Sequence, residues 1–101
     1  MQLKVHRLTG RHRLTGAIAL GVPGAGEALM FRDCRSLHGW FMRGPLDVVF
    51  VDRDGIVLRV TNLRPWRARF VLSGAHALEL APGEAERLNI VPGAVLKNIS
   101  I

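Results

Sequence analysis

The sequence predicts a single, mainly β domain over residues 1–101, built as a small curled sheet or partly closed barrel with two short helices. Short runs of alternating apolar and polar residues indicate strands with one buried face. Turns rich in Gly and Pro separate these runs at close spacing, so roughly six or seven short strands are expected. A length of 101 residues suffices for one domain with one modest core.

The first part of the chain begins with a strand and a helix. Residues 2–8 alternate between apolar and polar side chains and predict a first strand with one buried face. Residues 11–20 carry Leu14, Ala17 and Ile18 at helical spacing and predict a short helix. The elements expected next are a loop over 21–26, a strand over 27–31, a polar turn over 32–35 and an aromatic-rich strand over 36–43.

A hairpin is the clearest local signal in the middle of the chain. Residues 46–51 contain the nearly pure β-branched and aromatic run Val-Val-Phe-Val, which predicts a buried strand. Asp54-Gly55 lies between this strand and a second apolar run over 56–60. Because both Asp and Gly tolerate positive φ, this pair favours a tight reversal between two antiparallel strands.

The last third of the chain predicts two strands around a short helix. Residues 64–69 form a basic, proline-broken connection, and 75–80 form a strand. The Pro-Gly pair at 82–83 opens a short helix whose first turn is acidic, as the helix dipole favours. A Val-Pro-Gly turn ends this unit, and residues 94–101 alternate and predict a final strand.

Composition places the chain among globular domains of a reducing compartment. Hydrophobic residues make up 49%, which is sufficient for a packed core and argues against disorder. Cys34 is the only cysteine, so no intrachain disulfide can form. The sequence shows neither a secretory signal nor the run of about 20 apolar residues that a membrane span requires. We therefore expect a cytoplasmic protein with no membrane span.

Cys34, His38 and Asp47 are the residues best suited to chemistry. A Cys and a His four apart suit a metal site or a nucleophile with its base, but four residues of strand span roughly 13 Å. No second cysteine is present for a structural zinc site, and a free cysteine commonly packs as a small hydrophobe. Asp47 begins a buried strand and requires a partner, for which Arg43, His38 or backbone N–H groups are candidates. We expect no metal and no cofactor.

Glu79 lies between Leu78 and Leu80 in the strand predicted over 75–80, so its side chain points away from both leucines. Two interpretations follow: an acid on the solvent face, or a buried acid paired with an arginine. We expect the solvent face, where this carboxylate is available to a ligand or a partner.

The basic residues suggest an anionic partner. Lys and Arg number 14 against 8 Asp and Glu, for a net charge of +6. Arg64 and Arg67 flank Trp66, which suits stacking on a base or gripping a phosphate, or alternatively closing the end of a barrel. No nucleotide-binding motif is found, so nucleic acid is expected less than a protein partner. A nucleic-acid footprint would form if two basic segments shared one face: Lys4, Arg7, Arg11 and Arg13, and Arg59, Arg64, Arg67 and Arg69.

The segment from Cys34 to Gly55 resembles a known family. It reads Cys-Arg-Ser-Leu-His at 34–38 and Phe-Met-Arg-Gly-Pro-Leu-Asp-Val-Val-Phe-Val-Asp-Arg-Asp-Gly at 41–55. This order is similar to the central block of the bacterial and archaeal family called domain of unknown function 192. The later segments over 63–67 and 77–83 are similar to its later blocks. The resemblance implies a compact β-rich domain without an established reaction, and some relatives accompany pilus or secretion-assembly genes.

These observations predict a non-enzymatic binding or assembly module. The family resemblance suggests an association with pilus or secretion machinery. No catalytic constellation is complete in the sequence, and the strands are suited to packing. Two alternatives stay open: a small enzyme or ligand-binding site that uses Cys34, His38 and Asp47, and a basic nucleic-acid-binding module. Further candidate contacts with a ligand or partner are Arg43, Arg64, Trp66, Arg67 and Glu79.

Overall fold

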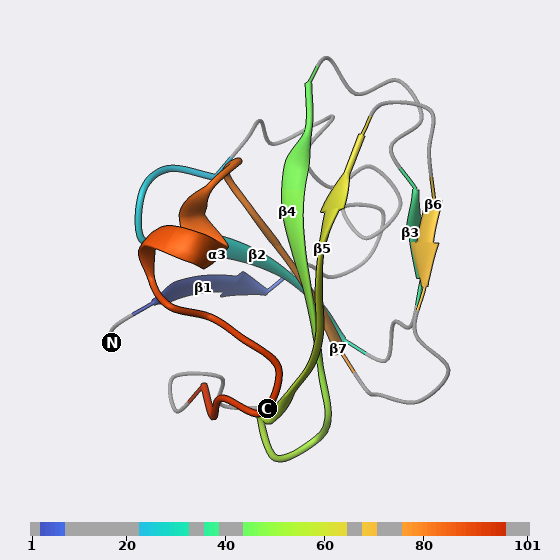
Figure 1. Ribbon diagram of the computed structural model, residues 1–101, viewed down its shortest axis with the longest axis vertical. Helices are drawn as coiled ribbons and strands as arrows, with labels where there is room; N and C mark the ends of the chain where they lie inside the picture. The colour runs from blue at the N-terminus through green and yellow to red at the C-terminus, as the bar shows by residue number, and fades with distance from the viewer. Residues whose placement is uncertain are drawn as a thin grey trace.

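The computed structural model describes residues 3–7, 23–32, 36–38, 44–64, 68–70 and 76–96. Seven strands and one short helix lie in these ranges (Figure 1). Their bounds in chain order are β1 Lys4–Arg7, β2 Glu27–Arg32, β3 Ser36–His38, β4 Leu46–Val51, β5 Val57–Leu63, β6 Ala68–Phe70, β7 His76–Leu80 and α3 Glu84–Arg87.

Five strands form one mixed sheet in the order β1-β2-β7-β4-β5, which we call the main sheet. β1 runs parallel to β2, and the other neighbouring pairs are antiparallel. β7 comes late in the chain but lies at the centre, and all five of its residues are buried. Within the described residues β1 and β5 occupy the two edges. The predicted mainly β fold is therefore confirmed, with the sheet open and not closed into a barrel.

β3 and β6 form a separate two-stranded antiparallel sheet, with Ser36 opposite Phe70 and His38 opposite Ala68. In Figure 1 this small sheet lies beside β5, on the side away from α3. The end of the connection predicted over 64–69 therefore belongs to a strand.

The hairpin between β4 and β5 is confirmed, with a longer turn than the Asp-Gly pair alone predicts. The ladder register shifts at the end of β4, just before the turn. Asp52 organises the turn, because its Oδ1 accepts hydrogen bonds from the backbone N–H groups of Asp54 (2.9 Å) and Ile56 (3.0 Å). Within the turn only Gly55 has a positive φ, at 82°. The glycine alone therefore uses the left-handed region.

The main sheet has two apolar faces, because successive residues of a strand point to opposite sides. The helix face packs against α3 and the C-terminal segment and contains Leu3, Ala28, Met30, Val49, Val51, Val57, Leu78 and Leu80 together with Ala85, Ile90 and Leu96. The far face, on the opposite side, contains Leu29, Phe31, Val48, Phe50, Leu63 and Ala77.

Most predicted elements that fall in the described ranges are confirmed. The strands predicted over 2–8, 27–31, 46–51 and 75–80 are β1, β2, β4 and β7, and the predicted acidic helix is α3. Residues 94–96 form one isolated bridge, between Val95 and Ile56, in place of the predicted start of a strand. The helix predicted over 11–20 and the strand residues 39–43 lie outside the described residues. The part of the chain that is described contains no helix long and apolar enough to cross a membrane.

We expect Gly55→Ala to destabilise the fold more than Gly83→Ala. Both glycines have a positive φ, 82° and 85°, which costs an L residue about 1–2 kcal/mol. A Cβ on Gly55 would in addition lie 2.8 Å from the backbone oxygen of Leu96, whereas a Cβ on Gly83 would have nothing within 4 Å. Urea denaturation of the two variants measures the difference. Equal losses of stability would show that the contact with Leu96 does not constrain the turn.

Candidate functional site

Glu79 is an acid at the centre of the main sheet. It lies in β7 between its partners Leu29 of β2 and Val48 of β4. Thr61 of β5 is the partner of Val48 and continues the same row. Glu79 alternates with Leu78 of the helix face, so its carboxylate is on the far face. Its two nearest cross-strand neighbours are therefore both aliphatic.

The Glu79 side chain is buried, with a relative exposure of 4%. The predicted solvent face is wrong, because β7 has strands on both sides and apolar side chains over both faces. Burial raises the pKa of Glu79 from 4.5 to about 7, since a low-dielectric environment disfavours the ionised form. Within the described ranges no cation or hydrogen-bond donor contacts this carboxylate, so the paired-arginine interpretation is not observed there.

The next row of the far face is aromatic. Phe31 of β2 and Phe50 of β4 flank Ala77 of β7, two residues from Glu79. The half-buried Arg59 is the β5 partner of Phe50 and ends this row at the sheet edge. The carboxylate of Glu79 thus lies beside a row that combines two aromatic rings with one small side chain.

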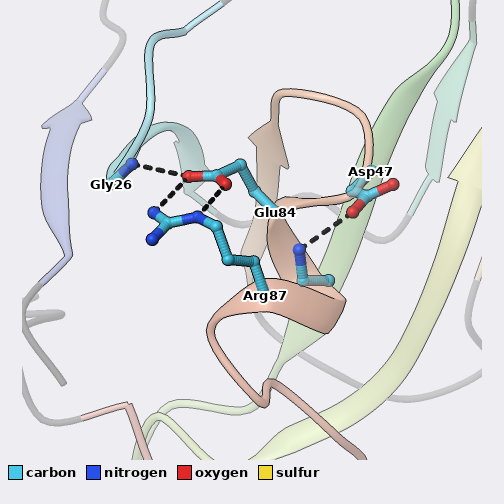
Figure 2. A network of polar contacts seen from close by, with 5 residues as sticks. Gly26, Asp47, Glu84 and Arg87 are labelled. Carbon is cyan, nitrogen blue, oxygen red and sulfur yellow. Dashed lines mark hydrogen bonds and ion pairs between the residues drawn. The ribbon is translucent and has the colours of Figure 1, made fainter.

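Asp47 belongs to the same sheet but faces the other way. It is the partner of Leu80, whose side chain is on the helix face. The Oδ2 atom of Asp47 accepts a hydrogen bond of 2.9 Å from the backbone N–H of Ala85, in the first turn of α3 (Figure 2). This bond satisfies a donor that the start of a helix leaves unpaired. The predicted backbone N–H partner of Asp47 is confirmed, and its role is to hold α3 on β4.

Glu84 anchors α3 to the turn before β2. Its Oε1 accepts hydrogen bonds from the backbone N–H of Gly26 (2.6 Å) and from Nη2 of Arg87 (2.8 Å), and its Oε2 accepts from Nε of Arg87 (Figure 2). The Arg87 hydrogen bonds, followed by the Gly26 N–H, lower the pKa of Glu84 to about 2. The spacing of Glu84 and Arg87 was visible in the sequence. The contact with Gly26 was not, because it spans 58 residues.

The two carboxylates of the main sheet are on opposite faces. General acid–base chemistry requires its groups within hydrogen-bond reach of a shared substrate. Asp47 and Glu79 cannot meet this condition, because the sheet itself lies between them. Among the described residues no three His, Cys, Asp or Glu side chains are grouped to hold a metal ion.

The other predicted site residues are only partly placed. His38 ends β3 in the small sheet, and Asp47 is used by α3 on the helix face of the main sheet. The convergence of these residues with Cys34 stays a prediction. Outside the described residues lie Cys34, Arg43, Trp66 and Arg67.

In the two basic segments, Lys4 and Arg7 lie on β1, Arg59 lies on β5, and Arg69 lies on β6 of the small sheet. Lys4 is exposed on β1, whereas Arg59 is in β5 and the exposed Arg64 directly follows it. Three strands, β2, β7 and β4, lie between β1 and β5. Lys4 and Arg59 are thus far apart on the main sheet, and a shared face for the two basic segments stays a prediction.

The fold and the site define a small mixed β-sheet domain with a helix held on one face and a buried acid on the other. The family model DUF192, described as "Uncharacterized ACR", matches residues 9–98 of the chain. The chain belongs to this family, and the resemblance of its central block to domain of unknown function 192 is confirmed.

The curated relatives are archaeal. The UPF0127 protein of Pyrococcus abyssi is 39% identical over 66 residues, which cover 52% of this chain and 56% of that protein. The UPF0127 protein of Pyrococcus horikoshii is 39% identical over 51 residues, 44% of each chain. The chain thus spans about half the length of the curated relatives that it matches.

Two crystal structures share the fold. A protein of unknown function from Novosphingobium aromaticivorans has a TM-score of 0.72 at 26% identity, over 88% of this chain and 69% of that chain. A putative transcription regulator from Sinorhizobium meliloti has a TM-score of 0.76 at 21% identity, over 90% of this chain and 78% of that chain. At 21% identity the likeness shows the fold alone.

We expect the stabilising effect of Glu84 to disappear in acid. Its folded pKa of about 2 is below the ordinary 4.5, so its contribution is complete above pH 5 and is lost as the pH falls towards 2. Glu84→Gln should therefore be less stable than the wild type at pH 7, and the difference should shrink between pH 5 and pH 2. Denaturant unfolding at several pH values measures it, with the exposed Glu86→Gln as control. A difference that does not change with pH would contradict the ion pair.

We expect Glu79→Gln to stabilise the protein at alkaline pH. The folded pKa of about 7 is above 4.5, so the cost of ionising Glu79 grows as the pH rises from 4.5 to 7 and is complete above 7. A rise of the pKa from 4.5 to about 7 corresponds to about 3 kcal/mol in the free energy of unfolding. The variant should gain up to that amount at pH 8 relative to the wild type, and the gain should vanish near pH 4. If the variant gains no stability at pH 8, the ionised carboxylate of Glu79 must be stabilised by a partner in the folded protein.

Proposed function

We propose that this chain is a non-enzymatic binding module whose ligand contacts Glu79 on the far face of the main sheet. The observation that carries the proposal is an acid with 4% exposure in the central strand, between Leu29 and Val48. Buried polar groups normally have hydrogen-bond partners, and buried charges are normally paired. A bound ligand would supply the partner that the described residues do not provide.

The free-energy cost of burying the Glu79 carboxylate supports a functional role for this residue. An apolar side chain at position 79 would continue the aliphatic row and avoid a desolvated carboxylate. Residues that break a local packing rule in an otherwise consistent core are concentrated at functional sites. Among the buried or half-buried carboxylates Asp47, Glu79 and Glu84, Glu79 breaks the rule most plainly, since Asp47 and Glu84 both have hydrogen-bond donors.

Binding is favoured over catalysis because the acids are not arranged to work together. Asp47, the carboxylate of the predicted chemical set, accepts a hydrogen bond from the backbone N–H of Ala85 in α3 on the opposite face. A lone acid with a pKa near neutrality can hold a ligand but has no second described group to complete an acid–base pair. Assembly in pilus or secretion machinery is the finer form of this proposal and rests on the family resemblance alone.

The proposal is tested by recording amide NMR spectra of the full chain with a panel of small amines, carboxylates, alcohols, amides and sugars at pH 8. We expect at least one compound to shift the amide signals of Leu29, Val48 and Glu79, and to be recovered chemically unchanged. The hairpin amides of Asp54 and Gly55 serve as the internal control, because they lie at the end of the sheet.

Two variants make the test specific. Glu79→Gln should remove the shifts, and its loss of binding would not come from unfolding, because this variant is expected to be the more stable. Asp47→Asn changes an acid of the same sheet on the opposite face and should keep them. If no compound shifts the far-face amides, or if a binder is converted into a product, the binding-module proposal is wrong.

A further inference from the structure

We infer that Asp54 is a site of covalent self-modification, at which the chain forms isoaspartate through a cyclic imide with Gly55, and that Asp52 controls the rate of this conversion. The modification is independent of the proposed ligand. It follows from the Asp-Gly pair, from the exposure of Asp54 and from the hydrogen bonds that Asp52 accepts in the hairpin turn.

The two reacting groups belong to neighbouring residues. The sequence contains one Asp-Gly pair, at 54–55, and no Asn-Gly pair. The backbone nitrogen of a glycine can approach the carboxyl carbon of the preceding side chain closely, because glycine has no Cβ to obstruct it. Asp54 is exposed, so water has access to its carboxyl group. The hairpin turn thus presents both reacting groups and the water that the reaction consumes.

The conversion has two steps and involves no oxidant or reductant. The nitrogen of Gly55 attacks Cγ of Asp54 and forms a C–N bond, while the nitrogen loses its proton and the carboxyl group loses a hydroxyl, which leave as one water molecule. A second water then cleaves the five-membered imide ring at the former backbone carbonyl carbon. The chain now continues through Cγ, the former backbone carbonyl becomes a free carboxylate, and the mass is unchanged.

Asp52 opposes the first of these steps. Its Oδ1 accepts hydrogen bonds from the N–H groups of Asp54 (2.9 Å) and Ile56 (3.0 Å), and its backbone oxygen accepts one from the N–H of Gly55 (3.1 Å). Three consecutive N–H groups therefore bond to one residue, and the middle one carries the attacking nitrogen. This nitrogen is released only when the turn opens locally, so the folded chain reacts slowly.

Isoaspartate at position 54 would loosen the segment over 93–96 from the hairpin. The backbone oxygen of Gly55 accepts a hydrogen bond of 2.9 Å from the N–H of Leu96. The two residues are so close that a Cβ on Gly55 would lie 2.8 Å from the backbone oxygen of Leu96. Isoaspartate adds one carbon atom to the backbone between positions 54 and 55. Gly55 then loses the position from which it bonds to both Asp52 and Leu96.

The conversion is measured in the full chain at pH 8 and constant temperature. Isoaspartate has the mass of aspartate, so electron-transfer fragmentation of the peptides that contain position 54 identifies it. We expect the folded chain to convert at least about tenfold more slowly than the same chain unfolded in guanidinium chloride. Asp54→Glu is the negative control, because its longer side chain cannot close the five-membered ring.

Two substitutions of Asp52 make the measurement specific. Asp52→Ala removes the side-chain acceptor and should raise the rate of the folded chain at least about tenfold, because hydrogen bonds to a charged acceptor are strong. Asp52→Asn keeps an oxygen acceptor and should give a rate between those of Asp52→Ala and the wild type. Glu84→Gln, which is expected to lower the stability away from the turn, should convert at the wild-type rate.

Four results would overturn the inference. Unfolded chain that forms no isoaspartate would show that Asp54 is not a modification site. Equal rates in the folded and unfolded chain, or equal rates for Asp52→Ala and the wild type, would show that Asp52 does not control the conversion. Equal acceleration by Asp52→Ala and Glu84→Gln would show that global unfolding sets the rate. In the purified product, amide hydrogen exchange at Leu96 should be faster than in the unmodified chain, and unchanged exchange would contradict the predicted loosening.

Discussion

The structure depends on the insertion of β7 between β2 and β4. Without this strand, β1 and β2 would form one short ladder and β4 and β5 another, and no pairing between described strands would join the two. β7 uses both of its edges for pairing and both of its faces for packing, so all five residues from His76 to Leu80 are buried. The same constraint that creates the core therefore forces the carboxylate of Glu79 into it.

The acids on the two faces of the sheet have different hydrogen-bond partners. On the helix side, Asp47 accepts a hydrogen bond from a backbone N–H of α3, and Glu84 of α3 accepts one from the turn before β2. Two carboxylates thus hold a helix of only four residues in place. A helix this short has little stability of its own, and tertiary contacts must supply it. On the far side, Glu79 has apolar cross-strand neighbours and stabilises no described element.

Local patterns in the sequence predicted the elements but not their order. The Val-Val-Phe-Val run and the Asp-Gly pair indicate β4 and its hairpin from neighbouring residues alone, and the structure confirms both. Glu79 was misplaced because the alternation of Leu78, Glu79 and Leu80 indicates one polar face without showing what covers it. That depends on strands whose partner residues, Leu29 and Val48, are distant in the sequence. The bond between Asp47 and Ala85 spans 38 residues and was hidden for the same reason.

Glu79 and Glu84 are close in the sequence, but their surroundings shift the pKa of the same residue type in opposite directions. Arg87 and the N–H of Gly26 lower the pKa of Glu84 to about 2, so its charge is constant near neutral pH and serves the fold. Burial alone raises the pKa of Glu79 to about 7, where a small change in its surroundings alters its charge. A carboxylate that the protein itself already keeps ionised, such as that of Glu84, is stabilised little further by an additional partner. Glu79, with a pKa near neutrality, is therefore the acid whose charge its surroundings can still change, whereas the charge of Glu84 is fixed by its hydrogen bonds.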